Sequence, residues 1–239
     1  MILKDIYDPA FVEELFGSMS ATYERMNLVT SFGFSLRWRR QCVEAANLPQ
    51  GITVVDLMSG MGEAWEYILR ETEGKAHIIG VDFCQAMLEF AKRRQTALAG
   101  SSIQIRCENA LNTSLPDGSA DAIISTFGLK TFSQDQLAAL AAEAWRILKP
   151  CGVISMVEIS QPNSVLLSIP YLFYLKIVIP ALGKLFLGNP ENYRMLGIYT
   201  EQFGDCSKAI PPLEKLGFEV KLTSFFFGCA TGFVAIKPA

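Results

Sequence analysis

The sequence has only one histidine, His77, and none of its six cysteines pairs as C-x-x-C. A single histidine excludes a multi-histidine metal centre and a histidine-based catalytic triad. The cysteine spacing gives no support for a zinc site, so we expect reduced structural thiols and no metal. His77 begins an apolar run typical of a strand, and we expect a structural or surface role for it.

Charge is also scarce, because charged residues make up 19% of the chain and the net charge is -3. No long basic run is present, so nucleic acid is not expected as a main partner. The first sixteen residues are acidic and lack the basic-then-apolar pattern of an export signal, which favours a cytoplasmic protein. No repeat or low-complexity linker is visible in the 239 residues, a length that suits one α/β domain with an elaboration. The oligomeric state stays open.

Strand-like apolar runs alternate with helical segments from about residue 52. This alternation predicts right-handed βαβ units and a doubly wound, mostly parallel sheet. Two last runs, 218–227 and 230–237, leave no room for a helix between them, so they should pair as an antiparallel hairpin. The expected strands number seven, and the first five fall at 52–58, 77–82, 102–108, 120–128 and 152–160.

We expect a single domain over residues 1–239 with three parts. Residues 1–50 should form a helical cover, 51–160 and 205–239 the cofactor-binding core, and 161–204 an apolar helical insertion or lid. Within this insertion, segment 164–188 is strongly apolar but contains two prolines and two lysines, which argue against a simple membrane span. A cover over the pocket or a surface in peripheral contact with a membrane is favoured, and ordinary packing helices are an equal alternative.

The stretch "VVDLMSGMGEAW", residues 54–65, has the form of a nucleotide-binding strand and glycine loop. In the dinucleotide fingerprint a third glycine lets the helix pack close to its strand, but Trp65 stands at that place. Asp56, at the end of the strand, would repel a nearby pyrophosphate. These two residues therefore disfavour NAD and FAD.

S-adenosylmethionine (SAM) fits this loop better, because it has no phosphate and carries two cationic groups. Gly60 and Gly62 permit close backbone approach, and Asp82, at the end of the second strand, is placed to accept the ribose hydroxyl protons. Each acid has a structural alternative: Asp56 would cap the next turn, and Asp82 would cap the helix that starts near Gln85.

Several blocks then resemble one family: "YERMN…SFGFSLRWRR", "DLMSGMGE", "GVDFCQAML", "ENALNTSLPDGSADAIISTFGLKTF", "AWRILKPCGVISMVEISQP", "ENYRMLG" and "LEKLGF". Together they are similar to the UbiE-type methyltransferases, class I SAM-dependent enzymes that C-methylate quinone precursors in ubiquinone and menaquinone synthesis. The resemblance covers nearly the whole chain. It implies a Rossmann-like class I methyltransferase fold and SAM as cofactor.

The resemblance also implies site residues. The cofactor contacts fall on Ser59, Gly60, Met61, Gly62, Asp82, Asn109, Ala110 and Thr126. To these the charge argument adds Asp56. The chain departs from the family pattern at Ser59 and Met61 in the loop, and at Cys151, where the family has glycine.

After "YRMLG" the chain reads Ile198-Tyr199-Thr200 where the family has E-S-I on the substrate side. The leading hypothesis is a methyltransferase acting on a lipophilic, quinone-like small molecule. A SAM-dependent enzyme of the same fold with another acceptor, or one that transfers another group, is the alternative. A nicotinamide oxidoreductase and a non-catalytic SAM-binding protein are less favoured.

Methylation of a quinol carbon is helped by removal of a phenolic proton. The candidate bases are Tyr23, Glu158 and a bound water, and Tyr193 and Arg194 are candidates for contact with the acceptor's oxygens. Structural alternatives stay open here as well: the two tyrosines would simply pack, and Glu158 would pair with a lysine.

Overall fold

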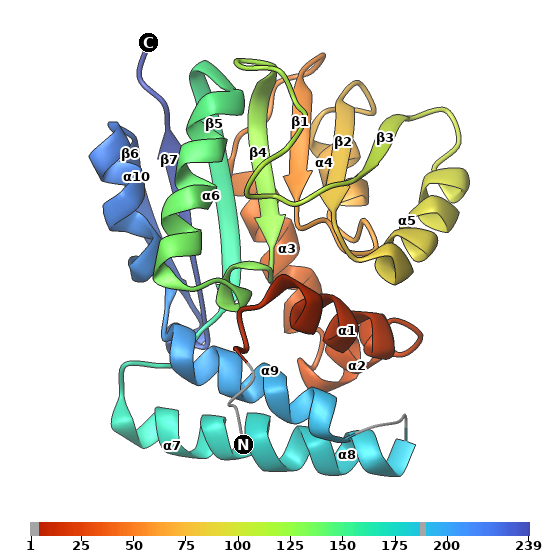
Figure 1. The fold of residues 1–239 in the computed structure, drawn as a ribbon, viewed down its shortest axis with the longest axis vertical. Helices are drawn as coiled ribbons and strands as arrows, with labels where there is room; N and C mark the ends of the chain where they lie inside the picture. The colour runs from red at the N-terminus through yellow and green to blue at the C-terminus, as the bar shows by residue number, and fades with distance from the viewer. Residues whose placement is uncertain (1–4, 187–189) are drawn as a thin grey trace.

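A seven-stranded sheet forms the centre of the computed structural model, which describes residues 5–186 and 190–239 (Figure 1). Residues 1–4 of the expected cover and 187–189 of the expected insertion lie outside the described residues. The strand order is β3-β2-β1-β4-β5-β7-β6. The bounds are β1 Thr53–Leu57, β2 His77–Asp82, β3 Ser102–Cys107, β4 Ala120–Thr126, β5 Leu148–Ile159, β6 Glu219–Phe225 and β7 Ala230–Ile236.

The first five strands are parallel, and β7 pairs antiparallel with both β5 and β6. The predicted parallel sheet and its terminal hairpin are therefore confirmed. His77 lies at the start of β2, where its Nδ1 is 2.7 Å from the Ser102 hydroxyl at an exposed position. This contact fits the structural role expected for the single histidine. All six cysteines are free.

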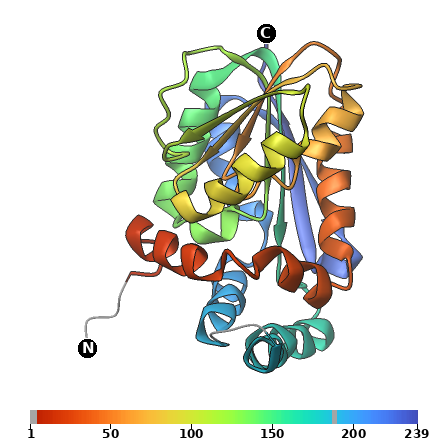
Figure 2. The same ribbon diagram turned by 90° about the vertical axis from the view of Figure 1, so that its right-hand side faces the viewer.

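Helices cover both faces of the sheet, because alternate residues of each strand point to opposite sides. Val54 belongs to the core on one face, which is covered by α3 (Phe34–Ala45), α4 (Trp65–Glu71) and α5 (Gln85–Ala97). Val55 belongs to the core on the opposite face, which is covered by α6 (Gln134–Ile147) and α10 (Ile210–Leu216). Figure 2 shows the two layers edge-on. Helix α6 begins at a capping box in which Ser133 and Gln136 satisfy each other's backbone N–H groups.

Two further sets of helices lie at the carboxyl ends of the parallel strands (Figure 1). The first is α1 (Pro9–Met19) and α2 (Tyr23–Thr30), and the second is α7 (Val165–Phe173), α8 (Ile179–Phe186) and α9 (Pro190–Phe203). A π-helical turn, Tyr174–Val178, joins α7 to α8. Among the described residues, one helical stretch, Val165–Lys184, is long and apolar enough to cross a membrane.

The prolines of this stretch do not break it. The helix continues through Pro170 and, after the π turn, through Pro180, the second residue of α8. The π turn after Pro170 fits the general finding that such turns accompany local irregularity in helices.

Candidate functional site

The glycine loop leaves β1 through left-handed backbone conformations at Met58, Gly60 and Gly62, with φ values of 56°, 55° and 76°. A Cβ atom added to Gly62 would lie 2.6 Å from the Trp65 ring, and one added to Gly80 on β2 would meet the same ring at 2.6 Å. Trp65 is fully buried. The tryptophan therefore fills the space that two glycines leave, which explains how the helix packs without a third glycine in the loop.

Asp82 ties this loop to the end of β2. Its Oδ2 accepts a hydrogen bond from the Gly60 backbone N–H at 2.8 Å, and its Oδ1 accepts one from Cys84 N–H at 2.8 Å. Cys84 is the N-cap residue of α5, so Asp82 also holds the start of that helix. Burial raises the pKa of Asp82 to about 6, although both backbone donors favour the ionised form.

A small cavity of about 70 Å³ lies beside this carboxylate. Four of the predicted site residues line it, and they are Tyr23, Gly60, Asp82 and Thr126. Val12 and Phe16 of α1 close one side of it. The site is therefore formed by the loop, the ends of β2 and β4, and the N-terminal helices.

Asp56 is buried beneath the loop, outside the lining of the cavity. Its two carboxylate oxygens, the Ser59 hydroxyl and the Trp65 indole N–H make no hydrogen bond of normal geometry among the described residues. Burial raises the pKa of Asp56 well above its usual range, Glu63 raises it further, and the adjacent Trp65 indole partly opposes this. A buried carboxylate without a partner is costly, and it favours a nearby positive charge.

Glu63 and Arg39 line the same cavity, and sequence reasoning did not single them out. Glu63 Oε1 lies 3.0 Å from Arg39 Nη2, and its Oε2 accepts from Met61 N–H at 3.1 Å. The Arg39 guanidinium lies 5.0 Å from the centre of the Phe127 ring. A signal existed for both, since Glu63 ends the block "DLMSGMGE" and Arg39 belongs to "LRWRR".

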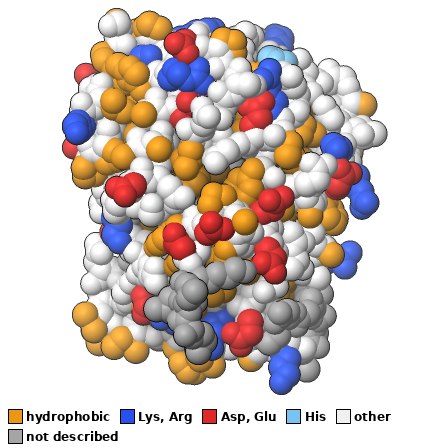
Figure 3. All heavy atoms as spheres, viewed as in Figure 1, with side chains coloured by type: hydrophobic (Ala, Val, Ile, Leu, Met, Phe, Trp, Pro, Cys, Tyr) orange, Lys and Arg blue, Asp and Glu red, His pale blue; other side chains and the backbone are white. Residues whose placement is uncertain are grey.

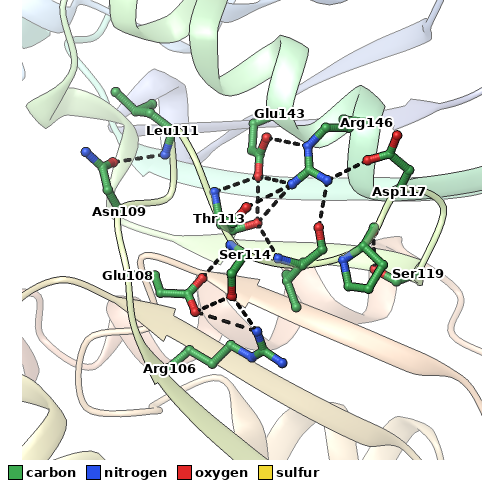
Figure 4. Close-up of polar contacts among 12 residues, drawn as sticks. Arg106, Glu108, Asn109, Leu111, Thr113, Ser114, Asp117, Ser119, Glu143 and Arg146 are labelled. Atoms are coloured by element: carbon green, nitrogen blue, oxygen red, sulfur yellow. Dashed lines mark hydrogen bonds and ion pairs between the residues drawn. The ribbon is translucent and has the colours of Figure 1, made fainter.

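The loop after β3 carries Asn109 and Ala110, and Figure 4 shows Asn109 on it. The Asn109 side chain is exposed and accepts a hydrogen bond from Leu111 N–H at 2.9 Å, whereas Ala110 is buried. Thr113 holds the loop in place because its hydroxyl donates to Glu143 at 2.6 Å. Neither Asn109 nor Ala110 lines the small cavity.

A second cavity, of about 380 Å³, adjoins the first, since Tyr23 and Phe127 line both. Its walls are mostly apolar. They come from α2, α3, the insertion and the turn after β6, and include Met26, Phe34, Trp38, Tyr171, Leu175 and Ile179. Segment 164–188, one expected role of which is to cover the pocket, contributes Tyr171, Tyr174, Leu175 and Ile179 to these walls.

Lys130 also lines the larger cavity, as a buried cation that sequence reasoning missed. Its Nζ lies 2.8 Å from Glu158 Oε1 and donates to the Phe127 carbonyl at 2.8 Å. Glu158 is fully buried at the end of β5, outside the lining of both cavities. The structural alternative for Glu158, a lysine pair, is therefore the arrangement found.

Of the remaining candidate residues, Tyr193 borders the larger cavity and Arg194 does not. Tyr193 lines the larger cavity, and its hydroxyl is 2.7 Å from that of Thr22. Arg194 is exposed on α9, outside the lining of both cavities, 3.7 Å from Glu191. Burial raises the pKa of the Tyr23 phenol, and the nearby Glu63 carboxylate raises it further. Tyr23 is therefore a neutral hydrogen-bonding group near pH 7.

A model of the ubiE/COQ5 methyltransferase family matches residues 3–237 of the chain. The chain belongs to the ubiE/COQ5 methyltransferase family. It is a SAM-dependent methyltransferase, as its loop chemistry and sequence blocks predicted. The demethylmenaquinone methyltransferase of Thermus thermophilus is 31% identical over 94% of this chain and 100% of its own length. The one of Staphylococcus saprophyticus is 32% identical over 95% of this chain and 96% of its own length.

Solved structures share the class I fold. A SAM-dependent methyltransferase from Aquifex aeolicus has a TM-score of 0.58 at 18% identity, with 83% of this chain and 88% of that chain covered. Phosphoethanolamine N-methyltransferase 2 from Haemonchus contortus has a TM-score of 0.61 at 13% identity, with 93% and 60% covered.

One departure from the family pattern predicts a gain in stability. Cys151 is exposed and has a φ of 61°, a left-handed conformation that favours the glycine of the family. Cys151→Gly is therefore expected to raise the free energy of unfolding by up to about 1 kcal/mol, measured by urea denaturation. Cys107→Gly, in β3, is the matched control and should lower it. A lower stability for Cys151→Gly would contradict this account.

Proposed function

We propose that this enzyme methylates a ring carbon of a lipophilic, quinol-like acceptor related to demethylmenaquinol. The observation that carries the proposal is the junction of the two cavities. The acidic, glycine-bordered cavity meets a much larger apolar one at Tyr23 and Phe127. The names of the relatives, demethylmenaquinone methyltransferases, point to the same acceptor.

The residues beside the smaller cavity fit SAM. Asp82 and Glu63 offer carboxylates to hydroxyl and ammonium groups, and Gly60 offers close backbone approach. Bound there, SAM would supply a methyl group activated by its sulfonium. The other proposed contacts are the loop residues Ser59, Met61 and Gly62, Asn109 and Ala110 on the adenine side, and Thr126. Asp56 would act from beneath the loop, where a cationic cofactor favours the ionised form that burial alone disfavours.

The acceptor's oxygens would meet three polar groups in the larger cavity. Lys130 brings positive charge near an oxygen that loses its proton, which makes the ring more nucleophilic. Tyr23 and Tyr193 would hold the ring by hydrogen bonds. Since Glu158 is paired with Lys130 and the Tyr23 phenol stays protonated, a bound water is the base we propose. The enzyme's main contribution is positioning in a dry pocket.

The expected parts of the single domain fit this proposal. We propose that residues 1–50 cover the cofactor, since Val12 and Phe16 line the smaller cavity. The insertion, 161–204, would cover the acceptor, since Tyr171 and Ile179 line the larger one. We keep a cytoplasmic location as part of the proposal.

A comparison of acceptors tests the proposed function. With SAM supplied, reduced demethylmenaquinone is expected to give a kcat/KM at least about a hundredfold higher than a panel of simple phenols, because the apolar cavity favours the larger ring and tail. Methyl transfer is measured by mass spectrometry. Equal or better turnover of a small phenol or amine would favour the alternative, a different acceptor. Thr200, in the triplet that departs from the family, lines this cavity and is where such a change would act.

A further inference from the structure

Helix α7 and the π turn after it carry an apolar stripe that points to solvent. Val165, Ile169, Phe173 and Ile177 are exposed at a constant spacing of four residues, which places them on one side of the helix. Leu166 beside them is 88% exposed. The other side of the same helical stretch lines the larger cavity. The stretch is therefore apolar on both sides, and an outward apolar side indicates a missing partner.

Two turns next to this helix hold exposed phenylalanines in strained backbone conformations. Phe32 is 80% exposed with a φ of 50°, and Phe227 is 78% exposed with a φ of 56°. A left-handed conformation costs a residue with a side chain about 1–2 kcal/mol. Within the described chain these two rings remain mostly outside the core, so burial in the fold does not offset that cost. Strain of this kind gathers at functional sites.

The helix and the turns form one continuous surface around the mouth of the larger cavity. The Phe32 ring stacks on Tyr174 at 6.2 Å between ring centres, and the Tyr171 hydroxyl donates to the Cys229 carbonyl at 3.2 Å. Phe32 and Phe226 also line the cavity. We call the exposed residues of this surface the apolar rim: Phe32, Val165, Leu166, Ile169, Phe173, Ile177, Phe226 and Phe227. Hydrophobic side chains gather over α7 at the lower edge of Figure 3.

The segments that carry the apolar rim are themselves basic. Residues 25–43, 159–186 and 223–229 contain no acidic residue, although the whole chain has a net charge of -3. Glu201 and Glu44, from outside these segments, pair with Lys176 and Arg40. These segments carry exposed basic residues, among them Arg25, Arg37 and Lys184. Anionic lipid headgroups would attract this surface. A second copy of the chain would bring the same basic residues against each other, which disfavours a dimer through this face.

We propose that the apolar rim docks on an anionic lipid bilayer and places the mouth of the larger cavity at the acyl region. The exposed phenylalanines and the stripe of α7 enter the boundary between headgroups and acyl chains. A lipid-tailed acceptor then passes into the cavity without crossing water. The acceptor named in this inference rests on the proposed function, whereas the docking itself requires no acceptor.

Vesicle flotation with the full-length protein tests the docking. The vesicles contain phosphatidylcholine and phosphatidylglycerol at about three to one, or phosphatidylcholine alone. The wild type is expected to float with the anionic vesicles and several-fold less with the neutral ones. Ile169→Ser/Phe227→Ser should lower the partition coefficient about tenfold, because two apolar side chains no longer enter the bilayer. Leu222→Ser/Ile236→Ser is the matched control, since it removes two exposed apolar residues from β6 and β7 and should float like the wild type.

Methyl transfer to a tail-less demethylated naphthoquinol separates the two proposals. Ile169 and Phe227 lie outside the cavity lining, so the rim variant should keep this activity and lose activity only on a tailed acceptor embedded in vesicles. A wild type that fails to float, or a rim variant that floats like the wild type, overturns the docking. A dimer that the rim variant dissociates overturns it as well. Failure on every quinol, with flotation intact, counts against the proposed function alone.

Discussion

Asp82→Ala is expected to weaken SAM binding about a hundredfold. Hydrogen bonds to a charged acceptor contribute about 1.5 kcal/mol or more each, and two ribose hydroxyls donating to Asp82 give about 3 kcal/mol. The variant also loses the link between Gly60 and the end of β2, where the carboxylate accepts the Gly60 N–H at 2.8 Å. Isothermal titration calorimetry with SAM measures the change.

The same carboxylate predicts how SAM affinity depends on pH. Because the pKa of Asp82 is raised to about 6 in the free protein, half of the Asp82 carboxyl groups are protonated at pH 6. Hydroxyl donors and a cationic ligand favour the ionised form, so affinity should be constant above about pH 7 and fall towards tenfold per pH unit below about pH 6. The wild-type profile should show this fall, and Asp82→Ala should be nearly flat.

Asp121→Ala serves as the control for this pair of measurements. Asp121 is also a carboxylate on a core strand, and it accepts from Thr53 N–H at 2.8 Å and pairs with Lys149, outside the lining of both cavities. Its loss should leave the affinity for SAM unchanged. Normal SAM affinity in Asp82→Ala would refute the cofactor site proposed for this chain.

Lys130→Met is expected to lower the free energy of unfolding by about 3–5 kcal/mol. The change leaves the Glu158 carboxylate, which is fully buried at the end of β5, without its cation. The surface pair Lys92–Glu89 offers a comparison, because both side chains are about half exposed. Lys92→Met should therefore change stability by less than about 0.5 kcal/mol. Urea denaturation followed by circular dichroism measures both.

A double variant separates stability from activity. Lys130→Met/Glu158→Leu removes both charges, and replacing a buried ion pair with apolar residues is often neutral or stabilising, so most of the stability should return. Methyl transfer should stay low in the double variant, because the positive charge beside the acceptor is still missing. Wild-type turnover in a stable double variant would contradict the role proposed for Lys130.

Much of the fold could be predicted from the sequence, because the patterns that indicate it are local. The alternation of strands and helices, the short gap before the last strand and the glycine loop each depend on a few neighbouring residues. The cofactor could be predicted for the same reason, since Asp56 and Trp65 lie within the segment of the glycine loop itself. The helical stretch through Pro170 was harder to predict, because surrounding packing decides whether a helix tolerates a proline.

The sequence by itself determined the class of protein: a parallel sheet with a terminal hairpin, a glycine loop suited to SAM, and the ubiE/COQ5 methyltransferase family. Only the tertiary structure decided which charged groups serve the site. It paired Glu158 with Lys130, left Arg194 at the surface, and brought Glu63, Arg39 and Asp82 together. The residues brought together in this way are 19 to 43 positions apart in the sequence and come from separate elements. Because side-chain pairing over such distances depends on how helices pack on the sheet, no local pattern encodes it.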